Sequence, residues 1–158
     1  DTVEEFKKIS NQKVKFFAIG EGNCRTEIEN YIKQKGLEND IILTGFRNDI
    51  PEIFPELDVF LITSEEEGLG TTVLDGIANK IPIVATAGGG IPEMIIHENT
   101  GLLYPIKDSK HLAEGINSIL NDLNSATLRT ENAYKLLLEK FTKKNTAQQT
   151  LEVYKKYC

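Results

Sequence analysis

The densest pattern in this chain is EEEGLGTTVLDGIANKIPIVATAGGGIPE, residues 65–93. A run of acidic residues leads into Gly-Leu-Gly, and an apolar segment with a single carboxylate, Asp75, follows. The strand-like IPIVATA comes next, and three glycines close the stretch. Acidic residues and glycines between apolar segments indicate that the functional residues of this protein lie on the loops that connect its buried elements.

The rest of the chain continues the same alternation of short apolar strands and helices. Strands are predicted at 14–20, 40–46, 58–64, 82–87 and 101–105, and helices at 24–35, 48–57, 70–80, 92–97, 109–122, 126–140 and 144–157. Asn23 is the expected N-cap and Gly36 the expected C-terminal stop of the first helix, and Asp108 is the expected cap of the helix at 109–122.

Continuous apolar strands that alternate with helices predict an α/β fold. The expected architecture is a Rossmann-like, doubly wound parallel sheet with helices on both faces and the last helices appended. Such sheets bind ligands at the carboxyl ends of their strands. The loops at that edge are 20–23, 45–49, 64–70 and 87–93.

Composition narrows the classes of function. The 158 residues suffice for a single domain, and the net charge of -6 argues against nucleic acid as a partner. No apolar run is long enough to cross a membrane. The two cysteines, Cys24 and Cys158, occur in no metal or redox motif, which favours a reducing compartment and hence the cytoplasm. The only methionine is Met94, so we expect a piece of a longer polypeptide.

Neither histidine suggests a metal site. His97 and His111 have no ligand partners at usable spacing, and there is no DxD motif, so we expect the protein to act without metal.

The loop at 64–70 admits two interpretations. Gly68 and Gly70 could open the N-terminus of the following helix to a phosphate, or they could simply make a tight turn. Glu67 and Asp75 flank that helix start, and Asp75 shares a helix face with Thr71. The Asp75 carboxylate could bind ligand hydroxyls, or it could bond nearby backbone or a lysine. The glycines by themselves favour the tight turn, because short glycine patterns are common, whereas the two alternatives for Asp75 stay open.

The order of these motifs resembles the C-terminal domain of family 4 retaining glycosyltransferases, which have the GT-B fold. That family carries a pattern of the kind E-G-x-G-x(4)-E-A-x-A-x-G-x-P-V-V-A-T, then G-G-x-x-E and G-L-L. Here residues 67–70 match its start, 82–86 its strand, and 89–93 and 101–103 the remainder. Upstream, 20–22, Arg25 and 42–64 also fit. The resemblance covers nearly the whole chain.

The resemblance implies a role for each site residue. Glu67 would lie near the donor sugar as the catalytic residue, and Asp75 would hold the ribose hydroxyls. The other donor-binding positions would be Gly20 and Gly22, Phe46 and Arg47 flanking the base, and Gly68, Leu69, Gly70 and Thr71 near the diphosphate. Glu93 would hold other site residues in position without touching the donor, or it would simply be a carboxylate at the start of a helix.

Two features depart from the family pattern. Asp75 replaces a glutamate, and Lys80 replaces a glycine at a helix end, where Asn79 could adopt the left-handed conformation instead. The family's first strand, with an Arg and a Lys that neutralise the diphosphate, is also missing. That strand is central in the family's sheet, so its absence should either weaken the fold or leave a gap between 14–20 and 58–64.

The resemblance therefore implies the nucleotide-sugar-binding domain of a retaining hexosyltransferase, spanning 1–158 without its first strand. The donor would be a UDP- or GDP-sugar, the acceptor a hydroxyl, and no cofactor would be needed. The partner would be the N-terminal domain of the same polypeptide, and the whole enzyme could associate peripherally with a membrane in polysaccharide biosynthesis. The fragment alone should be inactive.

Two alternatives compete with this function. A degenerate, non-catalytic nucleotide-binding module or a sugar-nucleotide epimerase relative stays open because of Asp75 and Lys80. A phospho-acceptor receiver domain is disfavoured, because the strand at 58–64 ends in Thr63 and Ser64 rather than in an aspartate.

Overall fold

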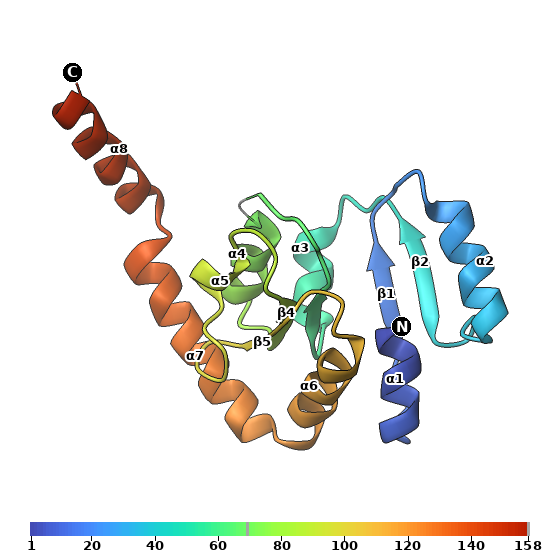
Figure 1. The fold of residues 1–158 in the computed structure, drawn as a ribbon. Helices are drawn as coiled ribbons and strands as arrows, with labels where there is room; N and C mark the ends of the chain where they lie inside the picture. The colour runs from blue at the N-terminus through green and yellow to red at the C-terminus, as the bar shows by residue number, and fades with distance from the viewer. Residues whose placement is uncertain (69, 158) are drawn as a thin grey trace.

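The computed structural model describes residues 1–68 and 70–157, and it consists of parallel strands flanked by helices (Figure 1). The strands are β1 (Phe16–Ile19), β2 (Ile41–Gly45), β3 (Phe60–Ile62), β4 (Ile83–Thr86) and β5 (Leu102–Tyr104). The helices are α1 (Thr2–Ile9), α2 (Arg25–Lys35), α3 (Ile50–Ile53), the 3-10 helix η1 (Phe54–Glu56), α4 (Thr71–Ala78), α5 (Ile91–Met94), α6 (Ser109–Asn121), α7 (Leu123–Lys140) and α8 (Lys143–Tyr157).

The strands form two parallel sheets rather than one. β1 pairs with β2, while β4 lies between β3 and β5 in the second sheet. The predicted α/β class, with parallel strands and helices on both faces, is confirmed. The predicted gap is confirmed too, because β1 and β3 are not paired with one another.

Side chains alternate between the two faces of β4 and bury both of them. Ile83 and Ala85 pack into a cluster with α4, α5 and α7, whereas Val84 packs with α1 and α6 on the other face. All four residues of β4 are buried, as expected for a strand covered on both sides. A third cluster joins Val3 of α1 to Ile32 of α2.

Three local predictions of helix ends differ from the structure. Cys24, not Asn23, is the N-cap of α2, and it makes no capping hydrogen bond through its side chain. Helix α7 begins at Leu123 rather than 126, because Asp122 closes α6 and caps α7. At the end of α4, Lys80 takes the positive φ of 55°, whereas Asn79 has a φ of −86°. Gly36 and Asp108 end and cap their helices as predicted.

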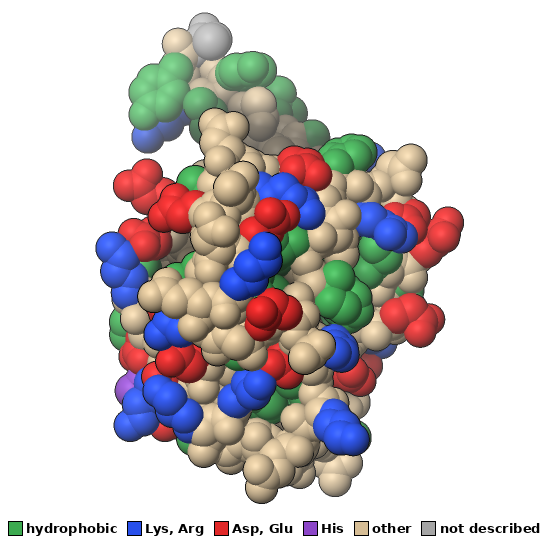
Figure 2. All heavy atoms as spheres, turned by 90° about the vertical axis from the view of Figure 1, so that its right-hand side faces the viewer, with side chains coloured by type: hydrophobic (Ala, Val, Ile, Leu, Met, Phe, Trp, Pro, Cys, Tyr) green, Lys and Arg blue, Asp and Glu red, His purple; other side chains and the backbone are tan. Residues whose placement is uncertain are grey.

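Helices α2 and α8 expose most of their side chains. On the face that α2 contributes, acidic and basic side chains are interspersed (Figure 2), as in the ion pair between Arg25 and Glu29. Helix α8 projects away from both sheets (Figure 1) and has no buried residue among those described. None of the helices in the described part of the chain has the length and apolar character that a membrane crossing requires.

The Asp122 cap should make the stability of the fold depend on pH in acid. Ser125 donates hydrogen bonds to this carboxylate from its hydroxyl, at 2.5 Å, and from its amide, at 3.1 Å. These bonds hold the pKa of Asp122 below its usual 3.8. A lowered folded-state pKa means that the stabilisation is present above the unfolded pKa and is lost as pH falls through the folded one.

Asp122→Asn should therefore unfold with a weaker pH dependence below about pH 4, since asparagine caps without titrating. Denaturant unfolding between pH 2 and 7 measures this. If the free energy of unfolding fell with pH as steeply in Asp122→Asn as in the unmodified protein, the assignment would be contradicted.

Candidate functional site

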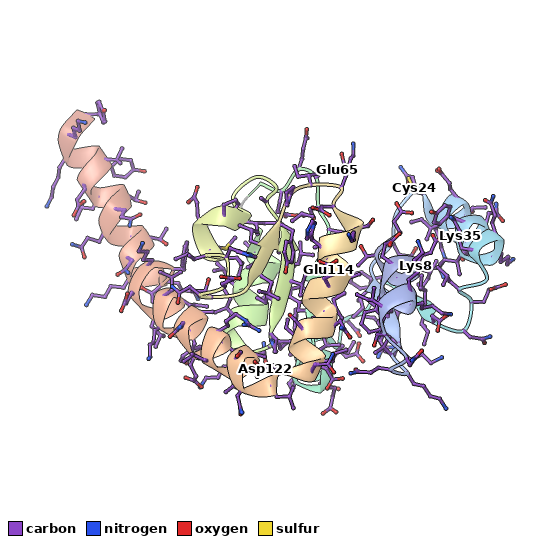
Figure 3. The ribbon with its side chains drawn as sticks, turned by 60° about the horizontal axis from the view of Figure 1, so that its bottom comes forward. Lys8, Cys24, Lys35, Glu65, Glu114 and Asp122 are labelled. Atoms are coloured by element: carbon purple, nitrogen blue, oxygen red, sulfur yellow. The ribbon has the colours of Figure 1, made fainter. Side chains whose placement is uncertain are left out.

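The predicted ligand-binding loops lie at one edge of the two sheets. They follow the carboxyl ends of β1, β2, β3 and β4, at the top of Figure 1. Figure 3 shows Glu65, from the loop after β3, and Cys24, after β1, towards the same edge, with Asp122 at the opposite one. The alternation of strands and helices thus brings the sequence's unusual loops to one side, as predicted.

The loops after β3 and β4 pack directly against each other through glycines. A Cβ atom on Gly89, whose φ is +52°, would lie 1.7 Å from the carbonyl oxygen of Glu67. A Cβ on Gly88 would lie 2.6 Å from the carbonyl oxygen of Ser64. The amide of Gly90 donates to the Glu67 carbonyl at 3.3 Å. Only residues without side chains allow this approach, so the glycines fix the backbone of the acidic loop.

The side chain of Glu67 is held next to the start of α4. A Cβ on Gly70 would lie 3.2 Å from Cγ of Glu67 and 3.1 Å from Cε of Met94. Met94 is buried and ends α5, so this apolar side chain lies against Gly70 at the start of α4. Glu67 itself is only partly exposed. Its position beside the helix start follows from the contact of its backbone with the loop after β4 and of its Cγ atom with Gly70.

Helix α4 begins without a side-chain cap. Its N-cap is Gly70 in the left-handed conformation, which makes no side-chain hydrogen bond. Val73 and Ile77 are buried, which leaves Thr71 and Asp75 exposed on the opposite face. Uncapped amides at a helix N-terminus favour an anion, and the Asp75 carboxylate lies one turn further along.

The two candidate carboxylates have no protein partner in the described residues. Neither Glu67 nor Asp75 makes a side-chain hydrogen bond or ion pair there, while the nearby Lys80 pairs with Glu131 at 2.9 Å. The alternative in which the Asp75 carboxylate bonds nearby backbone or a lysine is therefore not observed among the described residues. The Asp75 carboxylate remains accessible to ligand hydroxyls.

The sheet of β1 and β2 brings a second group of predicted residues to the same edge. The amide of Gly20 donates to the Gly45 carbonyl at 2.9 Å, and the side chain of Glu21 covers Gly45. Phe46 is 77% exposed, the largest exposed fraction among the large hydrophobic side chains described. Arg47 pairs with Asp49, and this guanidinium holds the pKa of Asp49 below its usual value.

Open space surrounds Gly22 and Gly68, so either position could accept a side chain without a clash. Leu69 lies outside the described residues. Glu93 is exposed in the first turn of α5. Among the described residues, no group of three or more His, Cys, Asp or Glu side chains is arranged to hold a metal ion.

Sequence reasoning missed the structural role of three residues. Gly88 and Gly89 appeared only as a motif, and Met94 only as a lone methionine, yet the two glycines hold the backbone of the loop at 64–67 and Met94 packs on Gly70. The signal available was the run of three glycines after a buried strand. The ion pair between Lys107 and Glu65, at 3.0 Å, also joins this loop to the loop after β5.

Comparison with known proteins agrees with this geometry. Residues 1–136 match the family described as glycosyl transferases group 1. This chain is a member of that family. It is 30% identical over 152 residues to an uncharacterized glycosyltransferase of Methanocaldococcus jannaschii, which covers 94% of the chain and 39% of the relative. It is 28% identical to N-acetyl-alpha-D-glucosaminyl L-malate synthase of Bacillus anthracis, covering 98% of the chain and 41% of that enzyme.

Solved structures give the same assignment for this glycosyltransferase chain. Anabaena HepE in complex with UDP and glucose superposes with a TM-score of 0.87 at 25% identity, covering 98% of the chain and 44% of HepE. The C-terminal domain of a group 1 family protein from Francisella tularensis gives 0.76 at 29% identity, covering 90% of the chain and 78% of that domain. The chain spans about 40% of the length of the curated relatives. The resemblance to GT-B glycosyltransferases is thus confirmed.

Proposed function

We propose that this chain binds the nucleotide of a sugar-nucleotide donor and belongs to a retaining glycosyltransferase that transfers a hexose to an acceptor hydroxyl. The observation that carries the proposal is the glycine contact between the loops after β3 and β4. It places Glu67 beside the uncapped N-terminus of α4, with the Asp75 carboxylate one turn away.

Each feature suits one part of a donor. The amides at Thr71 favour the diphosphate, whose negative charge grows when it leaves. The exposed Asp75 accepts hydrogen bonds from ribose hydroxyls, and each charge-assisted bond contributes about 1.5–3 kcal/mol. Glu67 lies where the sugar would follow the diphosphate. Phe46 and the backbone of Arg47 offer a surface beside the base. The bound UDP and glucose named for HepE support this class of donor.

The proposal extends to the whole polypeptide. Residues 1–158 form the C-terminal donor-binding domain, an N-terminal domain holds the acceptor, and the chain alone is inactive. The donor is a UDP- or GDP-sugar bound without metal, and the enzyme works in the cytoplasm. A non-catalytic nucleotide-binding module is the second candidate, favoured by Asp75, whose side chain is one methylene shorter than glutamate.

Saturation-transfer NMR with UDP, GDP and ADP tests the binding site. We expect ribose and base signals with at least one nucleotide, and Asp75→Ala should weaken binding by about tenfold or more, because a charge-assisted bond is lost. Glu139→Ala is the matched control, since Glu139 is also an exposed helix carboxylate but lies on α7. Equal signals from both variants would exclude Asp75 from the site.

A further inference from the structure

A buried threonine at the end of β4 is bonded to the acidic loop, residues 64–67, which carries Glu67. Thr86 is 1% exposed, and its hydroxyl donates a hydrogen bond to the carbonyl oxygen of Ser64 at 2.6 Å. The carbonyl oxygen of Ile62, the last residue of β3, lies 3.5 Å from the same hydroxyl. The bond therefore joins the end of the central strand of this sheet to the loop that follows its neighbour.

This bond lies just beyond the point where the pairing between β3 and β4 stops. The register ends with Ile62 opposite Ala85. Beyond it, the described residues show one backbone hydrogen bond between the acidic loop and the loop after β4, from the Gly90 amide to the Glu67 carbonyl at 3.3 Å. The hydroxyl of Thr86 therefore continues the attachment of these two segments past the last strand pair.

The glycines of the loop after β4 have a different part in the same contact. A Cβ atom on Gly88 would overlap the carbonyl oxygens of Ser64 and Glu65, and one on Gly89 would overlap that of Glu67. The absence of side chains permits the loops to approach, but it does not attract them to each other. The short hydrogen bond from Thr86 is attractive, so it holds the acidic loop against the glycines.

We infer that Thr86 is a positioning residue, whose hydroxyl fixes the acidic loop so that Glu67 and the start of α4 are arranged for donor binding. Thr86 is buried, so it acts through the loop and not on the ligand. A Cβ on Gly70 would lie 3.2 Å from Cγ of Glu67, so a shift of the loop moves this side chain relative to the N-terminus of α4. The inference rests on the proposed donor site.

Thr86→Val removes the hydrogen-bond donor and keeps the shape of the side chain. A methyl carbon and a carbonyl oxygen stay about 3.3 Å or more apart, whereas the Thr86 hydroxyl and the Ser64 carbonyl oxygen are 2.6 Å apart. The valine must therefore push the acidic loop outward or rotate away from it, and in both cases the carbonyl loses its partner. Thr86→Ser keeps the hydroxyl and is the conservative variant.

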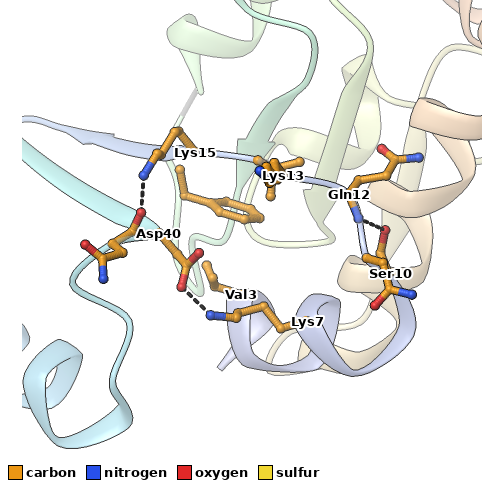
Figure 4. A pocket seen from close by; sticks show the side chains of 11 residues that line it. Val3, Lys7, Ser10, Gln12, Lys13, Lys15 and Asp40 are labelled. Atoms are coloured by element: carbon orange, nitrogen blue, oxygen red, sulfur yellow. Dashed lines mark hydrogen bonds and ion pairs between the residues drawn. The ribbon is translucent and has the colours of Figure 1, made fainter.

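Thr130→Val is the matched control on α7. Thr130 is 6% exposed, and its hydroxyl donates to the Thr127 carbonyl at 2.8 Å, so this substitution also removes a buried hydroxyl from a hydrogen bond. The amides of Lys13 and Lys15 serve as references within each protein. These residues line a cavity of about 440 Å³ at the amino end of β1 (Figure 4), whereas the candidate site lies at the carboxyl ends of the strands.

Two measurements by NMR test the inference separately from the proposed function. Hydrogen exchange without nucleotide reports on the Gly90 amide, whose bond to Glu67 depends on the position of the acidic loop. Titration with UDP, GDP and ADP in turn gives the affinities. We expect Thr86→Val to speed exchange of the Gly90 amide at least about threefold and to weaken nucleotide binding about tenfold, because a hydrogen bond that holds the loop is lost. Thr86→Ser and Thr130→Val should stay within about twofold of the unmodified chain, as should the reference amides.

Equal affinity in Thr86→Val and the unmodified chain would overturn the inference. So would equal losses of affinity in Thr86→Val and Thr130→Val, because a general loss of stability would then account for both. If the unmodified chain binds none of the three nucleotides, the proposed function fails, and the Gly90 amide decides whether Thr86 holds the loop. Faster exchange in Thr86→Val but not in Thr86→Ser would support that role, and equal exchange in the two would overturn it.

Discussion

Gly89→Ala is expected to lower the free energy of unfolding by about 2–4 kcal/mol, because it combines backbone strain with a steric overlap. Gly89 has a φ of +52°, which an L-residue adopts at a cost. Its new Cβ would lie 1.7 Å from the carbonyl oxygen of Glu67, so one of the two loops must move. Urea unfolding followed by circular dichroism measures the loss.

Gly68→Ala is the matched control in the adjacent loop. A Cβ at Gly68 meets nothing within 4 Å, and its unfolding free energy should change by less than about 0.5 kcal/mol. Because the displaced group in Gly89→Ala is the backbone of Glu67, nucleotide binding should weaken in that variant as well. A Gly89→Ala variant as stable as the Gly68→Ala variant would show that the loops are not in the contact described.

Phe6→Ala should cost about 3–5 kcal/mol, the range for removing a fully buried aromatic side chain. Phe6 is 0% exposed and packs edge-to-face on Phe16 of β1, with ring centroids 5.9 Å apart. The same cluster contains Val84 of β4 and Ile116 of α6. Phe6 therefore connects the two sheets, which no strand pairing joins in the described residues.

The loss of stability in Phe6→Ala should affect one sheet before the other. Truncation of Phe6 should release the β1–β2 sheet first, so the amides of β2 should lose hydrogen-exchange protection before those of β4. Phe46→Ala is the control, since Phe46 is 77% exposed and its removal should change stability little. Simultaneous loss of protection in both sheets would show that they unfold as one cooperative unit.

The sequence predicted the elements and their order because each strand is a short apolar run bounded by glycine or polar residues. It could not predict which residue ends α4 in the left-handed conformation. Lys80 takes that conformation while its ammonium pairs with Glu131 and lies 5.0 Å from the Tyr134 ring centroid. Both partners are on α7, more than 50 residues away, and no local propensity encodes them.

The candidate site shows the same division. Glu67, Gly70 and Asp75 stood out because a charged, glycine-bearing loop between apolar elements is unusual, but their expected roles came from the family resemblance. The reason for Gly88 and Gly89 was not identifiable, because it is the approach of another loop's backbone. The gap between β1 and β3 followed from comparing the element order with a family pattern. Which edges of β1 and β3 border this gap, however, is known only from the pairing of the strands.

A ¹⁵N NMR titration of this chain with UDP tests the proposed donor site most directly. We expect the amide signals of Gly68, Gly70 and Thr71 to shift together with that of Asp75, and those of α7 and α8 to stay in place. Shifts confined to other surfaces, or none at the start of α4 at millimolar UDP, where weak complexes are populated, would contradict a donor site at this edge.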